Sequence, residues 1–165
     1  MRILKASLIP FFLLTIVGSA VAGESEVTWT DPDKYTDVRS GNENRKHFKE
    51  RIFKNFEKHF AKLSEKLPEG KTLKINVTNV DLAGDVRFSS MQQIRIVKDI
   101  YIPRLEFSYE LINRDKSLAT SGEVDLKDMG FLTSSSSFKS NSVLYYEKRM
   151  IDKWFKNTFV PDKID

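Results

Sequence analysis

The sequence of 165 residues contains no cysteine. This absence excludes a disulfide framework, a lipid anchor attached to cysteine, a zinc site with cysteine ligands and a thiol nucleophile. A domain without covalent cross-links must be held together by the burial of apolar side chains. Apolar residues make up 40% of the chain and aromatic residues 12%, which is enough for such a core and argues against disorder.

Histidine is scarce as well, with only His47 and His59. On a helix these two residues would lie about 120° apart around the axis and about 18 Å apart along it, so they cannot bind one metal ion. His47 with Glu50 would supply only two ligands, which makes a weak site. The motifs G-x-S-x-G, H-E-x-x-H, G-x-G-x-x-G and the phosphate-binding P-loop are also missing. We therefore expect no metal, no cofactor and no catalytic triad.

Neither sign of charge dominates the chain. It has 27 Lys and Arg residues against 23 Asp and Glu residues, a net charge of +4. Arg2 and Lys5 lie in a segment that we expect to be removed, which leaves a net charge near +2. Such a small excess does not indicate a nucleic-acid partner. The export from the cytoplasm that the first 22 residues predict argues against that partner too.

The first 22 residues have the three parts of a secretory signal peptide. A positively charged start is followed by an uncharged apolar run over 6–22, and Ala20-Val21-Ala22 has the small residues of a cleavage site. The alternative is a permanent membrane anchor. The run of about 17 residues is at the lower limit for a membrane span, and a proline and a glycine interrupt it. We predict cleavage after Ala22 and a single periplasmic domain over 23–165.

The strongest periodic pattern predicts an amphipathic helix from about 43 to 66. Its apolar residues recur every three or four positions, and they are Phe48, Ile52, Phe56, Phe60, Leu63 and Leu67. Ser40-Gly41-Asn42-Glu43 has the form of a capping box at the start of this helix. Pro68 and Gly70 mark its end. The helix buries its phenylalanines only if another element covers that side.

Alternating apolar and polar residues predict the strands. The predicted strands are 27–30, 73–82, 105–111 and 118–126, and 94–97 is a further short candidate. The strand 73–82 has a bulge near Asn79. The strands 105–111 and 118–126 form a hairpin. A last helix is predicted over 143–158, with Asn141 or Ser142 as its cap. These elements give the order β-α-β-β-β-α.

This order predicts an α+β fold. Hairpins rather than crossovers favour a mainly antiparallel sheet. Each strand has one apolar face and each helix has one apolar side, so both helices are expected to pack on the same face of the sheet. The other face of the sheet is then open.

Aspartates gather in two predicted turns and form a candidate polar or ion site. Asp31 and Asp37 lie in the first loop, and Asp81 and Asp85 flank a later turn. If the sheet brings these loops together, the carboxylates can hold Ca²⁺ or share a proton. The alternative is structural, because aspartate commonly binds the local backbone in turns.

Glu147 interrupts the apolar stripe of the last helix, between Leu144 and Ile151. A carboxylate at that position needs a partner, because an unpaired buried charge is costly. The predicted partners are Arg104, Arg87 and Lys148. Three interpretations stay open for Glu147, namely a structural buried ion pair, a functional acid, and simple exposure at the edge of the stripe.

The basic side of the long helix is a second candidate site. Lys49, Lys54, Lys58 and Lys62 lie on this side, and a basic amphipathic helix can bind an anionic membrane surface. The alternative is that the phenylalanines of the helix fill the core and the lysines are only solvated. In either case the lysine side chains can contact lipid headgroups or an acidic partner.

Several short motifs, in a fixed order, resemble one known family. They are Trp29-Thr30-Asp31-Pro32 with Tyr35-Thr36-Asp37, Leu67-Pro68-Glu69-Gly70, Val80-Asp81-Leu82-Ala83-Gly84, Pro103-Arg104, Tyr146-Glu147-Lys148 and Trp154-Phe155. Together they are similar to the exported proteobacterial family known as domain of unknown function 3016. This resemblance implies a Gram-negative envelope location and carries no catalytic residues. Ile102-Pro103 departs from the two prolines expected there.

The function favoured by these observations is a non-enzymatic periplasmic binding or envelope-accessory protein. It would use the open face of the sheet or the loops around it, with an envelope protein or an anionic membrane surface as partner. One alternative is a small hydrolase, carboxylate-based or metal-dependent, built from Asp31, Asp37, Asp81, Asp85 and Glu147. Another is a peripheral membrane binder that uses the helix 43–66. Clustering of the five carboxylates in one cleft would favour the enzyme, and dispersal would count against it.

Overall fold

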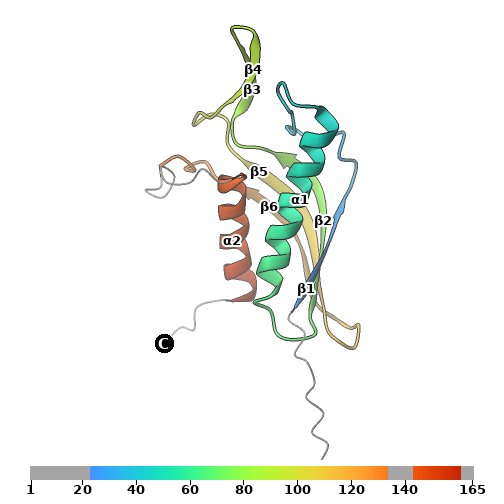
Figure 1. Ribbon diagram of the computed structural model, residues 1–165. Coiled ribbons are helices and arrows are strands. Elements are labelled where there is room, and N and C mark those ends of the chain that lie inside the picture. The colour runs from blue at the N-terminus through green and yellow to red at the C-terminus, as the bar shows by residue number, and fades with distance from the viewer. Residues whose placement is uncertain (1–22, 134–142, 161–165) are drawn as a thin grey trace, which may run out of the picture.

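The computed structural model describes residues 23–133 and 143–160 (Figure 1). The elements are β1 (Glu24–Trp29), α1 (Arg45–Ser64), β2 (Thr72–Asp81), β3 (Asp85–Ser89), β4 (Gln92–Ile96), β5 (Arg104–Ile112), β6 (Leu118–Lys127) and α2 (Tyr145–Phe159). The predicted α+β class is therefore confirmed. The predicted signal segment 1–22 and the predicted caps Asn141 and Ser142 lie outside the described residues.

The main sheet has four strands in the order β1-β2-β5-β6. Strand β5 is antiparallel to both β2 and β6, which confirms the mainly antiparallel sheet and the predicted hairpin. Strand β1, however, pairs with β2 in parallel, and α1 forms the crossover between them. A parallel pair needs a connection of a dozen or more residues, and alternation within each strand does not reveal which neighbour it will pair with.

A separate hairpin of β3 and β4 projects from one end of the main body (Figure 1). The sequence indicated only the second of these two strands, at 94–97. The turn at Ser90-Met91 lacks the glycine or asparagine that usually marks a two-residue hairpin, although Ser90 adopts a positive φ of 57°. For that reason the sequence does not indicate a strand at 85–89.

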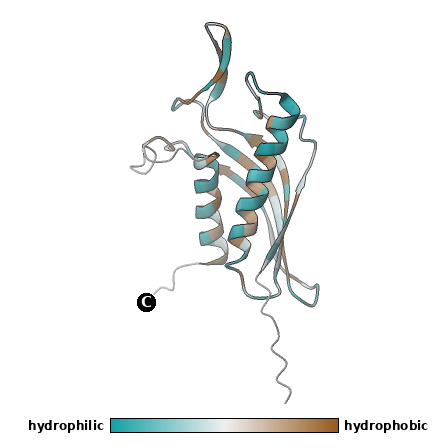
Figure 2. Cartoon of the chain, in the orientation of Figure 1, coloured by the Kyte–Doolittle hydropathy of each residue, from teal (hydrophilic) through white to brown (hydrophobic). Residues whose placement is uncertain are grey.

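Both helices cover the same face of the main sheet, as predicted (Figure 1). Phe56 and Phe60 of α1 are fully buried. The Phe107 ring of β5 lies between the helices, with its centroid 5.9 Å from that of Phe60 and 4.8 Å from that of Trp154 in α2. Edge-to-face contacts of this kind add to the burial of the rings. In Figure 2 the hydrophilic colour follows the outward side of α1. The helix is therefore amphipathic, as its periodicity indicated, with its apolar side on the core and its polar side in solvent.

Helix α1 begins two residues later than predicted because Asn44 is its N-cap. The Asn44 side-chain oxygen accepts hydrogen bonds from the backbone N–H groups of Lys46 (3.0 Å) and His47 (3.2 Å). The capping box predicted from Ser40 and Glu43 does not form, because the Glu43 carboxylate instead accepts a hydrogen bond from Arg51 Nη2 at 2.6 Å. Asn44 alone accepts from two free backbone N–H groups in the first turn of the helix.

The predicted bulge in β2 is confirmed between Val77 and Asn79. The extra residue, Thr78, is exposed, and Val80 returns to the core with no exposed surface. The Asn79 side chain accepts a hydrogen bond from the backbone N–H of Thr36 at 2.9 Å. The bulge therefore brings the loop after β1 against the end of β2.

Candidate functional site

Four of the predicted carboxylates gather where β2 ends and the β3–β4 hairpin leaves the main sheet. Asp37 and Asp81 form an isolated parallel bridge. Asp37 and Asp85 both bind the Arg39 side chain. Glu147 reaches the same loop from α2. Asp31 does not join them, since its side chain is 64% exposed and pairs with Lys34 at 2.8 Å.

Arginines neutralise two of these carboxylates. Asp37 is 4% exposed, and its oxygens lie 2.8 and 3.3 Å from the two terminal nitrogens of Arg95. The same Arg95 donates to the carbonyl of Gly84 at 2.9 Å. Asp85 binds Arg39 and also Arg87, whose Nε lies 2.5 Å away. These ion pairs fasten the base of the hairpin to the main sheet, so we interpret them as structural.

The buried Glu147 has a backbone partner rather than a charged one. Its Oε1 atom accepts a hydrogen bond from the backbone N–H of Ala83 at 2.8 Å, and the residue is 2% exposed. The predicted partners Arg104, Arg87 and Lys148 do not fill this role, because α2 packs its first turn directly on the loop between β2 and β3. Burial raises the pKa of Glu147 above that of an ordinary glutamate.

Most of the carboxylates at this end of the molecule are engaged in contacts within the fold. Burial raises the pKa of Asp81, and the nearby charge of Asp37 raises it further. Asp37 and Asp85 are held by arginines, and Glu147 by the backbone. Within 23–133 and 143–160, no three or more His, Asp or Glu side chains are grouped so that they could hold a metal ion. Three of the four clustered carboxylates, those of Asp37, Asp85 and Glu147, are therefore held by contacts within the fold.

Arg104, which was predicted to reach this cluster as a partner of Glu147, lies instead on the open face of the main sheet. Its Nε donates to Asp125 Oδ1 at 2.8 Å, and its Nη2 lies 3.0 Å from Glu106. These partners come from β6 and β5. Arg104 thus belongs to the surface that the helices leave uncovered.

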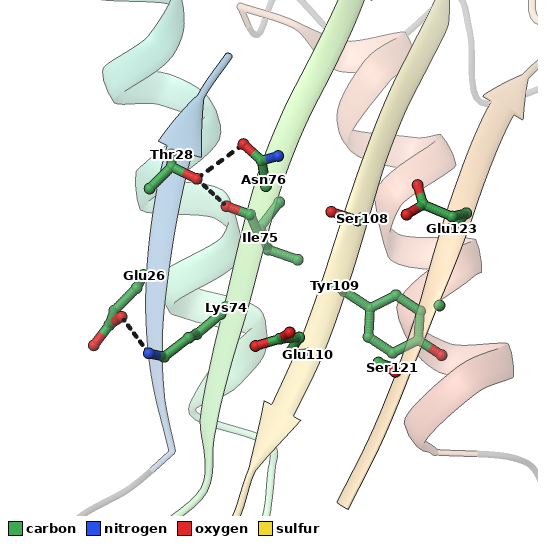
Figure 3. Close-up of a pocket in the computed structure, with 11 residues that line it drawn as sticks. Glu26, Thr28, Lys74, Ile75, Asn76, Ser108, Tyr109, Glu110, Ser121 and Glu123 are labelled. Atoms are coloured by element: carbon green, nitrogen blue, oxygen red, sulfur yellow. Dashed lines mark hydrogen bonds and ion pairs between the residues drawn. The ribbon is translucent and has the colours of Figure 1, made fainter. Parts of the chain in front are cut away.

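That open face holds a hollow with a volume of about 680 Å³ (Figure 3). All four strands contribute polar side chains to it, and these are Glu26, Thr28, Lys74, Asn76, Ser108, Glu110, Ser121 and Glu123. The side chains face the same way because alternate residues of a strand point to the same side of a sheet. Four strands in register therefore build one continuous polar surface.

Part of this surface is fixed by internal contacts and part is not. Lys74 Nζ lies 3.5 Å from Glu26 Oε2, and Thr28 Oγ1 donates to Asn76 Oδ1 at 3.1 Å (Figure 3). Glu110 and Glu123 are exposed, and neither carboxylate has a hydrogen bond or an ion pair within the described part of the chain. The hollow therefore offers two free carboxylates to a ligand.

The glutamates of the hollow were not singled out from the sequence. Their signal was the polar half of each alternating strand, which is plain in the sequence. What the sequence does not give is the register, in which Ser121 pairs with Glu110, and Glu123 with Ser108. Only that register brings the two glutamates together as diagonal neighbours.

The two layers of the fold carry opposite charge. The four strands of the main sheet have seven acidic and three basic residues. The two helices have eleven Lys and Arg residues and four acidic residues. The small net charge of the chain therefore conceals an acidic sheet on one side and a basic helix layer on the other.

Three of the four lysines predicted for surface binding are exposed on α1, namely Lys54, Lys58 and Lys62. Lys49, the fourth lysine, is not free to bind a ligand at the surface. Its side chain is 16% exposed, and its Nζ donates to Asp33 Oδ1 at 2.5 Å and to the carbonyl of Pro32 at 3.1 Å. Lys49 holds the loop after β1 against α1, so it is removed from the candidate surface.

None of the helices described is both long enough and apolar enough to cross a membrane. Comparison with known proteins finds no matching curated protein and no matching solved structure. A family model does match, over residues 23–157, and it carries the description "Protein of unknown function (DUF3016)". The match covers the whole of the main sheet and most of α2. The chain therefore belongs to this family, as the order of its short motifs indicated.

Proposed function

We propose that the protein is exported, is cleaved after Ala22, and acts in the periplasm as a non-enzymatic binding protein. Its binding surface is the open face of the main sheet, and its partner is an extended, basic segment of an envelope protein. The observation that carries this proposal is the pair of free carboxylates, Glu110 and Glu123, in the hollow of that face.

The proposed export rests on the signal-like first 22 residues and on the position of the folded domain. The family model starts at residue 23 and β1 starts at Glu24, so both follow the expected cleavage site. Gly23 is buried, and an added Cβ would overlap the carbonyl oxygen of Ser64 and lie 3.0 Å from Leu67 Cβ. A glycine directly after the expected cut is therefore suited to its place beside the end of α1.

The spacing of the two carboxylates fits an extended peptide. Glu110 lies opposite Ser121, and Glu123 is two residues further along β6, so the glutamates are diagonal neighbours about 7–8 Å apart. In an extended chain, residues i and i+2 lie on the same side, about 6.6–6.8 Å apart. A peptide with Lys or Arg at alternate positions can therefore place one cation on each glutamate, with charge-assisted hydrogen bonds.

The proposal is tested with a fluorescent peptide that has lysines at alternate positions. The test variant is Glu110→Gln with Glu123→Gln. The matched control is Glu65→Gln with Glu69→Gln, which changes the net charge equally at two exposed glutamates away from the sheet face. Fluorescence anisotropy at low salt should show binding to the unmodified protein that weakens about ten-fold in the test variant.

The control variant should bind the peptide as the unmodified protein does. Equal weakening in both variants would mean that peptide binding depends only on net charge. The open sheet face would then not be the binding surface. Failure of the unmodified protein to bind the peptide would also contradict the proposal.

A further inference from the structure

We infer that the helix layer is a docking surface for an anionic lipid bilayer, with the outer side of α1 against the phosphate headgroups. This surface is on the opposite side of the molecule from the open sheet face. The inference therefore goes beyond the binding function proposed above, and the two can be tested separately.

A ridge of unpaired lysines runs along α1. Lys54, Lys58 and Lys62 recur every four residues, so they lie above one another on one side of the helix, and Lys66 continues the line in the turn that follows. All four are exposed, and none of their ammonium groups has a hydrogen bond or an ion pair among the described residues. We name Lys54, Lys58, Lys62 and Lys66 the lysine ridge.

The lysine ridge is unfavourable for α1 by itself, because like charges at i and i+4 repel one another. Other basic residues of α1 do have acidic partners. Arg51 pairs with Glu43 at 2.6 Å, and Lys49 pairs with Asp33 at 2.5 Å. The ridge is thus the part of α1 that lacks compensation within the described fold. An anionic surface would supply that compensation at all four positions.

A cleft at the end of the ridge favours lipid over other polyanions. It lies between the last turns of α1 and α2 and has a volume of about 520 Å³. Its lining includes the charged residues Lys62, Lys66 and Asp152 and the apolar residues Leu63, Phe155 and Val160. Lysines thus stand beside apolar side chains, and Val160 is 43% exposed. A lipid has a phosphate for the lysines and the first methylenes of an acyl chain for the apolar part, whereas a nucleic acid or an acidic peptide has no such apolar part.

The shape of the fold permits this contact. The helices α1 and α2 lie side by side on one face of the sheet, and the β3–β4 hairpin extends from the end of the molecule rather than over them (Figure 1). A flat surface can therefore touch the outer sides of both helices. The acidic sheet face then points away from the bilayer, where a basic partner can reach it.

The experiment uses the processed chain that begins at Gly23, with vesicles of phosphatidylcholine alone or with one quarter phosphatidylglycerol added. The test variant is Lys58→Gln with Lys62→Gln. The matched control is Lys98→Gln with Lys116→Gln, which removes two exposed lysines that lie outside both helices. Co-sedimentation measures the fraction of protein bound to the vesicles, and circular dichroism checks that every variant is folded.

The unmodified protein should bind the anionic vesicles, should bind neutral vesicles much less, and should dissociate as salt is added. Each lysine near an anionic surface contributes about five-fold in binding, so the test variant should lose about 25-fold. The control variant should stay within about two-fold of the unmodified protein, because its lysines lie off the docking surface.

Three results would overturn the inference. They are equal binding to neutral and anionic vesicles, equal losses in the test and control variants, and complete displacement by a short DNA duplex at equal charge concentration. The last result would identify a general polyanion surface instead of a lipid one. The sheet variant Glu110→Gln with Glu123→Gln should still bind vesicles, so failure of the peptide-binding proposal would not be mistaken for failure here.

Discussion

The carboxylate of Glu147, in the first turn of α2, accepts a hydrogen bond from the backbone N–H of Ala83 at 2.8 Å. This bond joins the last helix to the loop between β2 and β3, across 64 residues of sequence. The cap residue of α2, Leu144, makes no side-chain hydrogen bond to the helix. Glu147 is therefore a buried polar contact that fixes the start of α2 on the sheet.

Removing the Glu147 carboxylate should destabilise the fold. In Glu147→Ala the buried N–H of Ala83 loses its acceptor, and we expect the free energy of unfolding to fall by about 1–3 kcal/mol. Glu147→Gln keeps an acceptor oxygen and should not lose stability relative to the unmodified protein. Urea unfolding followed by circular dichroism measures both changes. Equal losses of unfolding free energy in the two variants would show that the hydrogen bond to Ala83 does not account for the destabilisation.

The pKa of Glu147 gives the fold a dependence on pH. Burial raises this pKa in the folded state, so the folded protein binds the proton more tightly than the unfolded chain does. The stabilisation is complete below the unfolded pKa and is lost as pH rises through the higher folded pKa. Glu147→Gln lacks this titration. The stability of Glu147→Gln relative to the unmodified protein should therefore increase from about pH 4 towards neutral pH.

Unfolding of the two proteins over that pH range checks this difference directly. All other groups titrate in both proteins, so their contributions cancel to a first approximation. A difference that stays constant with pH, or that decreases as pH rises, would contradict a raised pKa at Glu147.

The Asp37–Arg95 pair should matter far more to stability than the exposed Asp31–Lys34 pair. Asp37 is 4% exposed, and Asp37→Ala would leave the partly buried Arg95 without its carboxylate, at a cost of about 3 kcal/mol. Asp31→Ala removes a surface pair and should cost about 0–1 kcal/mol. Thermal unfolding of the two variants provides the comparison. Similar effects would contradict the structural role given to the buried pair.

Processing after Ala22 is expected to leave Gly23 as the first residue. Expression in a Gram-negative host, followed by mass spectrometry of the periplasmic fraction, should recover a chain lacking residues 1–22. The variant Ala20→Leu with Ala22→Leu removes the small residues of the cleavage site and should stay at full length with the membrane fraction. Recovery of full-length unmodified protein from the cytoplasm would contradict export.

Most of the fold could be predicted because burial leaves a periodic trace in the sequence. The phenylalanines of α1, the alternation in β5 and β6, and the bulge near Asn79 all report which side chains are buried. Pairing between distant strands leaves no such trace, which is why the parallel β1–β2 pair was missed. The hairpin strand β3 was missed for a related reason, since its exposed Phe88 and the Ser90-Met91 turn lack the usual signals.

The site residues were harder to predict than the fold. The sequence correctly drew attention to Glu147, but it indicated a charged partner where the structure has the backbone N–H of Ala83. A backbone donor carries no residue type, so no sequence pattern marks it. Lys49 and its helix neighbours also look alike in sequence, and only the loop that carries Asp33 distinguishes Lys49. Glu110 and Glu123 become neighbours through strand register alone.

The most direct test of the binding role is to locate the bound peptide by NMR. The alternate-lysine peptide is titrated into ¹⁵N-labelled protein, and backbone amide shifts are followed along the chain. We predict shifts that cluster on the open face around Asn76, Ser108 and Glu123, with the β3–β4 hairpin unchanged. Shifts centred on the loop from Asp81 to Asp85, or spread evenly over the surface, would contradict the assignment of the open sheet face as the binding surface.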